Sequence, residues 1–147
     1  MSLKDEVALV TGASRGIGRA IALRLAHDGA RVVGTATSAA GAEGITAALR
    51  DLGGEGRVLD VRDAAACEAI IVEVGKAVGP ITILVNNAGV TRDTLMLRMK
   101  DSDWNDVIET DLGSVFRLSK AALRGMMKAR KGRIISIGSV VGGMGNP

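Results

Sequence analysis

The 147-residue sequence contains no tyrosine, and Trp104 and Phe116 are its only aromatic residues. Single-stranded nucleic acids are bound largely by aromatic side chains that stack on the bases, so this composition argues against a nucleic-acid-binding protein. Cys67 is the only cysteine. An internal disulfide is therefore impossible, and neither a cysteine-based zinc site nor another metal site is expected.

Long apolar stretches are also missing. No window approaches the roughly 20 consecutive apolar residues that a membrane-spanning helix needs. The chain begins with the charged residues Lys4, Asp5 and Glu6 and lacks the basic-then-apolar layout of a secretory signal. We therefore expect a cytoplasmic protein that does not contact a membrane.

Acidic residues are absent after Asp111. Up to that position the chain holds 12 basic and 16 acidic residues, although its total net charge is +3. The basicity is therefore a local patch, which is poor evidence for binding to nucleic acid. The patch comprises Arg117, Lys120, Arg124, Lys128, Arg130, Lys131 and Arg133.

Short apolar runs alternate with amphipathic stretches along the whole chain. A β-branched run such as residues 7–10 is typical of a strand that is buried on both faces. No hairpin signal separates the runs, so the pattern predicts right-handed crossovers and a parallel sheet covered by helices. The predicted strands cover residues 7–10, 31–35, 57–59, 81–85 and 134–137, and the predicted helices cover 20–28, 42–52, 63–78 and 104–127.

Two segments are less regular, one before the last predicted helix and one after the last predicted strand. Residues 91–101 are polar, and we expect Leu95, Met96, Leu97 and Met99 to make their apolar contacts. Residues 138–147 are predicted to form a glycine-rich loop.

The predicted elements form one dinucleotide-binding domain, residues 1–147, of the doubly wound α/β class. A complete sheet of this Rossmann type has six parallel strands in the order 3-2-1-4-5-6. Five are predicted here, in the order 3-2-1-4-5. The fifth would be an open edge of buried character, which proteins usually cover. We therefore expect the C-terminal part of the fold to be missing from this chain.

A glycine-rich turn, residues 12–18, follows the first strand and opens the first helix. In this context backbone N–H groups can approach a pyrophosphate, and the helix N-terminus favours an anion. The turn therefore predicts a dinucleotide site. The alternative is a structural turn whose glycines only allow close packing.

The acidic residue that marks NAD binding, about 20 positions after the turn, is absent. No acid occurs between Asp28 and Glu43. Arg15, Thr37 and Ser38 offer a cation and hydroxyl groups that suit a 2′-phosphate. The sequence thus favours NADP(H) over NAD. The alternative is that Arg15 is a solvated turn residue and that Thr37 caps a helix.

Three motifs occur at the ends of the predicted strands: Thr11-Gly12-x-x-x-Gly16-x-Gly18, Asp60-Val61 after the third strand and Asn86-Asn87-Ala88-Gly89 after the fourth. Together they resemble the classical short-chain dehydrogenases/reductases. Residues 34–38, 91–93 and 138–146 look like the 3-oxoacyl-[acyl-carrier-protein] reductases of fatty-acid synthesis.

This resemblance implies the roles of the residues around the cofactor, with Gly16, Ile17 and Gly18 completing the turn. Gly12, Ala13, Ser14 and Arg15 would hold the pyrophosphate and 2′-phosphate, Thr37 the 2′-phosphate, Asp60 and Val61 the adenine, and Asn87, Ala88 and Gly89 the adjacent ribose region.

The family's catalytic set is Asn, Ser, Tyr and Lys. Ser139 matches the serine that binds the substrate carbonyl. Asp111 stands where the family has asparagine, and its main-chain carbonyl could keep part of that role while its carboxylate adds a negative charge. The Tyr-x-x-x-Lys pair would lie beyond Pro147, so we expect this chain by itself to be inactive.

Neither His27 nor Cys67 is expected to replace the tyrosine. His27 is predicted at the end of the first helix, on the edge of the sheet opposite the ligand site. Cys67 is expected to pack as a small apolar residue.

The resemblance implies NADPH-dependent reduction of 3-oxoacyl-[acyl-carrier-protein] to the 3-hydroxyacyl form. Hydride would pass to the 3-ketone, Ser139 would bind its oxygen, and a tyrosine would donate the proton. Two alternatives remain: a non-catalytic NADP(H)-binding fragment, and a reductase of another carbonyl such as acetoacetyl-CoA.

The implied partners are acyl-carrier protein, docking at Arg130, and further copies of the chain. In this family the helix matching residues 104–127 forms a dimer face and helps to build a homotetramer. A solvated basic helix end, and a helix that only packs on its own sheet, are the respective alternatives.

Overall fold

Five parallel strands form the centre of the molecule. The structure is a computed structural model that describes residues 3–145. The strands lie in the order β3-β2-β1-β4-β5, and every neighbouring pair is parallel. This confirms the predicted doubly wound class and strand order. The strands are β1 (Val7–Val10), β2 (Arg31–Ala36), β3 (Glu55–Val58), β4 (Ile83–Asn86) and β5 (Arg133–Ser136).

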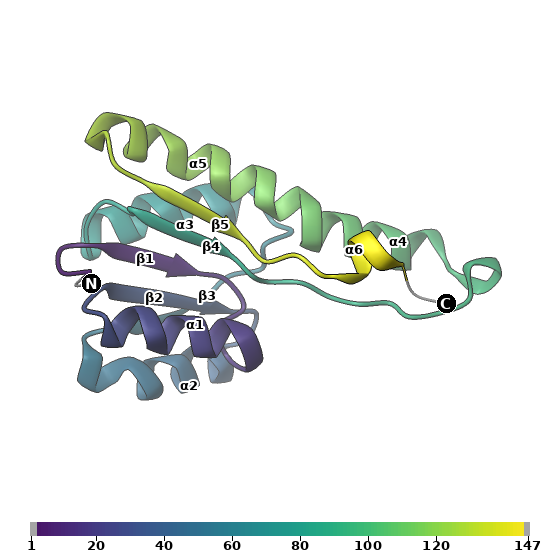
Figure 1. Cartoon of the computed structure of the whole chain (residues 1–147), viewed down its shortest axis with the longest axis horizontal. Coiled ribbons are helices and arrows are strands. Elements are labelled where there is room, and N and C mark those ends of the chain that lie inside the picture. Colours follow the sequence, from purple (N-terminus) through teal and green to yellow (C-terminus); the bar gives the residue numbers. More distant parts are fainter. Residues whose placement is uncertain (1–2, 146–147) are drawn as a thin grey trace.

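Helices cover both faces of the sheet. Figure 1 shows α1 (Gly16–His27) and α2 (Ala39–Leu49) on one side and α3 (Ala64–Ala77) and α5 (Ser114–Ala129) on the other. A short 3₁₀ turn, η1 (Arg50–Leu52), continues α2.

The residues of β1 show how the sheet separates two apolar cores. Successive side chains of a strand point to opposite faces. Val7 and Leu9 pack in the core beneath α3 and α5, whereas Ala8 and Val10 pack in the core beneath α1 and α2. All four residues are buried, which is why the run is apolar throughout rather than alternating.

Side-chain caps define where α2 and α3 begin. Ser38 accepts a hydrogen bond from the Gly41 N–H at 3.1 Å, and Asp63 accepts one from the Ala66 N–H at 3.0 Å. The prediction of Asp63 as a cap is confirmed. The α2 helix starts three residues earlier than predicted because the Ser38 hydroxyl satisfies the free N–H group of Gly41 in its first turn.

The predicted continuous helix over residues 104–127 is wrong in its details. It consists of α4 (Asp101–Val107), a π-helical segment η3 (Ile108–Gly113) and α5. Leu118, Ala122 and Met126 of α5 are buried against the sheet and α3, while Phe116 and Met127 are exposed. The fold of this chain therefore uses only part of the apolar stripe.

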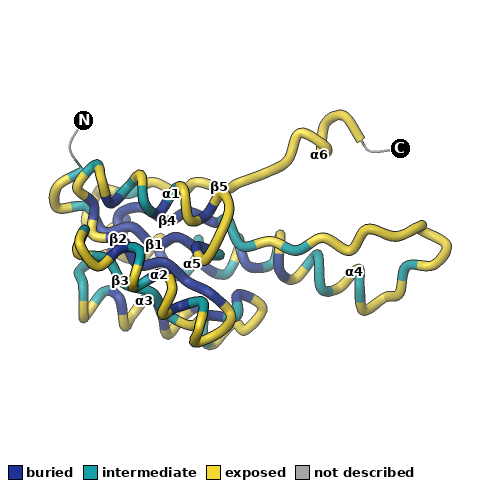
Figure 2. The backbone as a smooth tube through the Cα atoms, turned by 90° about the horizontal axis from the view of Figure 1, so that it is seen from below, coloured by how far each residue is buried: buried dark blue, intermediate teal, exposed yellow. Residues whose placement is uncertain are grey.

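The segment that precedes α4 also differs from expectation. Leu95, Met96 and Leu97 are 69%, 90% and 100% exposed, so the expected apolar contacts are absent for these three side chains, two of which lie in the short 3₁₀ turn η2 (Met96–Arg98). Figure 2 shows this segment and α4 projecting from the body of the molecule.

After β5 the chain forms a short helix, α6 (Val141–Met144), where only a loop was predicted. In Figure 2 this segment extends away from the sheet and lies apart from α4. Within residues 3–145, no helix is both long enough and apolar enough to cross a membrane.

Candidate functional site

A cleft of about 620 Å³ opens where the carboxyl ends of the central strands meet. Its wall is built from the loops that follow β1, β2, β3 and β4, the position at which doubly wound sheets bind ligands. All the predicted cofactor residues except Ala13 line it. They are Gly12, Ser14, Arg15, Gly16, Ile17, Gly18, Thr37, Asp60, Val61, Asn87, Ala88 and Gly89.

The N-terminus of α1 faces this cleft without a side-chain cap. Arg15 occupies the capping position but makes no capping hydrogen bond, in contrast to Ser38 on α2 and Asp63 on α3. The first N–H groups of a helix have no partner within the helix and carry partial positive charge. The end of α1 that lines the cleft is therefore suited to an anion.

Glycine is required at two positions of the turn. Gly12 has a φ of 64°, and a Cβ there would lie 3.0 Å from the Ala88 Cα. A Cβ on Gly18 would lie 2.2 Å from the Gly12 carbonyl oxygen and 2.4 Å from the Asn87 Nδ2. A side chain at either position would push the turn out of shape, so the glycine spacing follows from this geometry.

Thr11 connects the turn after β1 to the turn after β4. Its hydroxyl accepts hydrogen bonds from the N–H groups of Asn87 at 3.0 Å and Ala88 at 2.9 Å. The hydroxyl also lies 3.4 Å from the carbonyl oxygen of Val85, to which it donates. Thr11 is buried, and one side chain thereby holds two walls of the cleft together.

Ala13 lies outside the cleft although the family resemblance assigns it to the phosphate site. Its N–H donates to the Thr35 carbonyl oxygen at 2.9 Å, and its side chain is buried in the core beneath α1 and α2. Ala13 thus fixes the turn to β2 rather than facing the cleft.

Arg15 and Thr37 both line the cleft, and both are exposed. In the part of the chain that the structure describes, Arg15 takes part in none of the ion pairs. The cap of α2 is Ser38, so the alternative that Thr37 is a helix cap is wrong. The Thr37 hydroxyl and the Arg15 guanidinium remain candidates for binding a phosphate.

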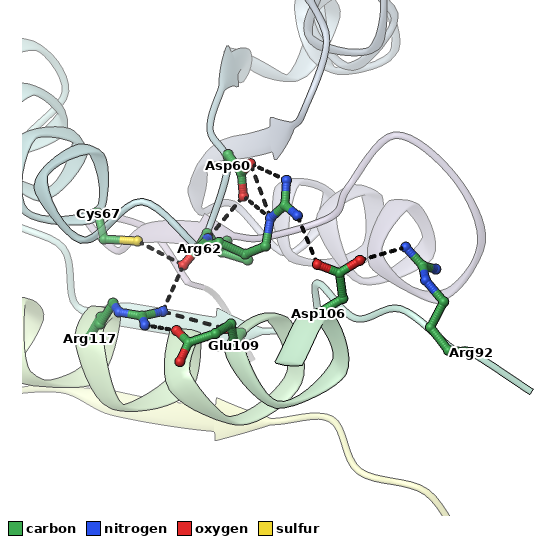
Figure 3. Close-up of polar contacts among 8 residues, drawn as sticks. Asp60, Arg62, Cys67, Arg92, Asp106, Glu109 and Arg117 are labelled. Atoms are coloured by element: carbon green, nitrogen blue, oxygen red, sulfur yellow. Dashed lines mark hydrogen bonds and ion pairs between the residues drawn. The ribbon is translucent and has the colours of Figure 1, made fainter. Parts of the chain in front are cut away.

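Three residues that sequence reasoning missed form a chain of ion pairs at the cleft (Figure 3). Arg62 binds Asp60 at 2.7 Å and Asp106 at 3.3 Å, and Asp106 also binds Arg92 at 3.4 Å. Hydrogen bonds from Arg62 hold the pKa of Asp60 below its usual range, and Asp60 in turn raises the pKa of Arg62. Arg62, Arg92 and Asp106 all line the cleft.

The two predicted catalytic residues lie outside the cleft lining. Asp111, in η3, accepts a hydrogen bond from the Val90 N–H at 2.8 Å through Oδ1. Ser139 is exposed after β5, and its hydroxyl accepts from the Val141 N–H at 3.2 Å. Within residues 3–145, no hydrogen bond joins the two side chains.

The side chains considered as substitutes for tyrosine are not placed for chemistry in the cleft. Cys67 is fully buried and donates to the Val61 carbonyl oxygen at 3.4 Å, and burial raises the pKa of its thiol. His27 is exposed at the C-terminal end of α1. In residues 3–145, no three His, Cys, Asp or Glu side chains are grouped so that they could hold a metal ion.

The strand order, the two helical layers and the glycine turn define a doubly wound, Rossmann-like fold with a ligand cleft at its switch point. A family model for short chain dehydrogenases matches residues 6–147, and the chain belongs to that family.

Two reductases and one solved structure are similar to almost the whole chain. It is 59% identical over 146 residues to 3-oxoacyl-[acyl-carrier-protein] reductase FabG of Escherichia coli, covering 99% of this chain and 59% of that protein. The Pseudomonas aeruginosa FabG is 60% identical over 148 residues, with 99% and 60% covered. A crystal structure of a candidate short-chain alcohol dehydrogenase from Sinorhizobium meliloti superposes with a TM-score of 0.94 at 35% identity, covering 99% and 59%. The chain thus spans about three-fifths of the length of these relatives.

Proposed function

We propose that this chain binds NADP(H) in the cleft and forms the cofactor-binding part of an NADPH-dependent 3-oxoacyl-[acyl-carrier-protein] reductase. The uncapped N-terminus of α1 beside Arg15 is the observation that carries this proposal, because it offers N–H groups and a cation at one place. The reductase part of the proposal rests on the 57–60% identity to proteins of that name.

The cleft fits a dinucleotide. A Cβ would fill the turn at Gly12 and Gly18, so the backbone there can approach a pyrophosphate closely. The turn residues, including Ser14, Gly16 and Ile17, would hold the pyrophosphate, and Arg15 and Thr37 the 2′-phosphate. Val61 and Asp60 line the part expected to take the adenine, and Asn87, Ala88 and Gly89 the part expected to take the ribose.

When bound, NADPH would supply the hydride that turns a ketone into an alcohol. Ser139 would donate a hydrogen bond to the carbonyl oxygen of the substrate, and Asp111 would contribute its main-chain carbonyl. The 147 residues include no tyrosine, so no phenol of this chain can protonate the alkoxide. We therefore expect the chain to bind the cofactor without reducing ketones.

The remaining parts of the proposal concern partners and organisation. Residues 1–147 would act as one dinucleotide-binding domain in a cytoplasmic protein. The exposed side of the apolar stripe on α5, with Phe116 and Met127, is consistent with packing against further copies in a homotetramer. Arg130 caps the C-terminus of α5 and is exposed, which suits a docking site for acidic acyl-carrier protein.

Titration of the chain with NADPH and NADH tests the cofactor assignment. We expect NADPH to bind at least about tenfold more tightly, the size of one charge-assisted hydrogen bond. Arg15→Ala and Thr37→Val should remove most of this preference without weakening NADH. Arg24→Ala, which removes a cation from the far end of α1, is the matched control. Equal affinities for the two nucleotides would contradict the proposal.

A second candidate function is a non-catalytic NADP(H)-binding unit. An activity assay tests it, with NADPH and an acetoacetyl thioester on acyl-carrier protein or on CoA. The missing tyrosine favours it for the 147-residue chain. We expect binding without turnover. Measurable reduction of either thioester would show that another residue of this chain donates the proton.

A further inference from the structure

Arg62 occupies the loop after β3 and lines the cleft where the base of a nucleotide is expected. Its guanidinium lies between two carboxylates that come from different parts of the chain, Asp60 in the same loop and Asp106 on α4. Figure 3 shows the three side chains in this arrangement. Half of the Arg62 side chain remains exposed, so a ligand in the cleft can contact it.

The carboxylate of Asp60 is largely committed to Arg62. Its Oδ1 accepts from the Arg62 backbone N–H and from Nε, both at 3.0 Å, and its Oδ2 accepts from Nη2 at 2.7 Å and Nε at 3.2 Å. A carboxylate offers about four acceptor positions. The single Nε–H is shared by both oxygens, so three N–H groups of Arg62 occupy Asp60 and about one acceptor position is left for the amino group of an adenine ring.

The guanidinium of Arg62 keeps its two flat faces free of these bonds. Asp60 binds the edge formed by Nε and Nη2, and Asp106 binds Nη1. All N–H bonds of a guanidinium lie in its plane, so carboxylates on two edges hold the plane but do not cover the faces. Such a face stacks favourably on an aromatic ring. Neither Trp104 nor Phe116 lines the cleft, so the flat π surfaces in its lining are the guanidinium groups of Arg15, Arg62 and Arg92. Of these, only Arg62 lies in the loop after β3, beside Asp60 and Val61.

We propose that Arg62 is the base-binding residue of the cleft. Held in plane between Asp60 and Asp106, its guanidinium stacks on the nucleotide base. Asp60 acts as a positioning residue for Arg62 rather than as a reader of the exocyclic amino group. This rests on the proposed binding of NADP(H). It follows that the cleft tolerates a change of the exocyclic group of the purine.

Binding of NADPH and of its hypoxanthine analogue, which replaces the adenine amino group by a carbonyl, tests this inference. The native chain should bind both within about threefold, because stacking depends little on the exocyclic group. Arg62→Lys keeps the charge but loses the flat face, and it should weaken both ligands about fivefold, within the range of a cation–π contact. Arg62→Phe restores a flat face and should recover most of the affinity.

Arg57→Lys is the matched control. Arg57 likewise bridges two carboxylates, Glu55 at 2.7 Å and Glu73 at 3.6 Å, but it lies outside the cleft. Its substitution should leave both affinities unchanged. Circular dichroism and thermal unfolding of each variant separate a lost binding contact from a lost fold.

Asp60→Asn distinguishes the two possible roles of Asp60. If Asp60 positions Arg62, the variant weakens both ligands equally and adds nothing in an Arg62→Lys background. A native preference of more than about tenfold for NADPH over the analogue, abolished by Asp60→Asn, would overturn the inference, because it would assign Asp60 to the amino group.

If the native chain binds NADPH tightly and Arg62→Lys binds it with the same affinity, Arg62 does not stack on the base. That result would overturn this inference and leave the proposed function standing. Failure of the native chain to bind either nucleotide would overturn the proposed function and this inference with it. The two failures are therefore distinguishable.

Discussion

The side-chain amide of Asn87 donates hydrogen bonds to the main-chain carbonyl oxygens of Thr11 and Gly12, at 3.0 and 3.1 Å. The two carbonyls belong to the turn after β1, whereas Asn87 follows β4. The same amide nitrogen lies only 2.4 Å from the position that a Cβ on Gly18 would take. The shape of the glycine turn is therefore held from outside, by a residue about half the chain away.

Replacing Thr11 by valine should destabilise the fold strongly. Valine has nearly the same shape but no hydroxyl, so the N–H groups of Asn87 and Ala88 lose their acceptor in a buried place. We expect a loss of about 2–3 kcal/mol in the free energy of unfolding, measured in urea. Thr11→Ser keeps the hydroxyl and should cost clearly less. A loss for Thr11→Val that is no larger than the loss for Thr11→Ser would contradict the role of the hydrogen bonds, because valine lacks only the hydroxyl and serine lacks only the methyl group.

Replacing Gly18 by alanine should distort the turn. The new methyl group would lie 2.2 Å from the Gly12 carbonyl oxygen, and relief of such overpacking costs about 1–3 kcal/mol. The affinity for NADPH should fall together with the free energy of unfolding. Gly44→Ala in α2 is the control, because nothing lies within 4 Å of a Cβ there. It should stabilise the protein by about 0.5–1 kcal/mol. A Gly18→Ala variant that unfolds and binds like the native chain would contradict the geometry.

Local patterns were sufficient to predict most of the sheet. The run at Val7–Val10 and the cap at Asp63 depend only on residues next to one another, and both predictions are confirmed. The strand order follows from alternation of strands and helices with right-handed crossovers. Boundaries at β3, β4 and β5 were off by one or two residues, because pairing with the neighbouring strand, not apolarity, decides where these strands begin.

Contacts between distant residues could not be predicted in the same way. Arg62 and Asp106 are 44 positions apart, and nothing in the spacing of charged residues distinguishes this pair from many others. The π-helical segment η3 is similar in this respect. Arg117 of α5 binds Glu109 within it and also reaches the Val61 carbonyl oxygen at 3.4 Å. Such contacts depend on the assembled fold, so the sequence pattern indicated only one uninterrupted helix.

Stability should depend on pH through Glu6 and Lys131. Lys131 forms an ion pair with Glu6, whose side chain is only 14% exposed, and hydrogen bonds from Lys131 and Thr82 lower the pKa of Glu6. A carboxyl group with a lowered pKa in the folded state stabilises the fold above its unfolded pKa of about 4.3, and this contribution is lost as the pH falls through the folded value.

Lys131→Met should therefore lower the free energy of unfolding at pH 7 by up to about 1 kcal/mol, because Lys131 itself is largely exposed. The difference from the native chain should shrink as the pH falls below the unfolded pKa of about 4.3, because protonation of Glu6 in the folded state removes the pair. Lys128→Met, on the exposed surface of α5, controls for the loss of a positive charge. A difference that stays constant from pH 7 down to the acid unfolding transition would rule out the ion pair as its cause.

Asp111 can be changed to asparagine without loss of its structural contact. Its Oδ1 accepts from the Val90 N–H at 2.8 Å, and the carboxamide oxygen of asparagine can occupy the same place. We expect Asp111→Asn to unfold within about 0.5 kcal/mol of the native chain, whereas Asp111→Ala should lose about 0.5–1.5 kcal/mol with the hydrogen bond. If Asp111→Asn were as destabilised as Asp111→Ala, the negative charge itself would hold the loop at Val90. The position would then not be interchangeable with the asparagine that the family resemblance implies there.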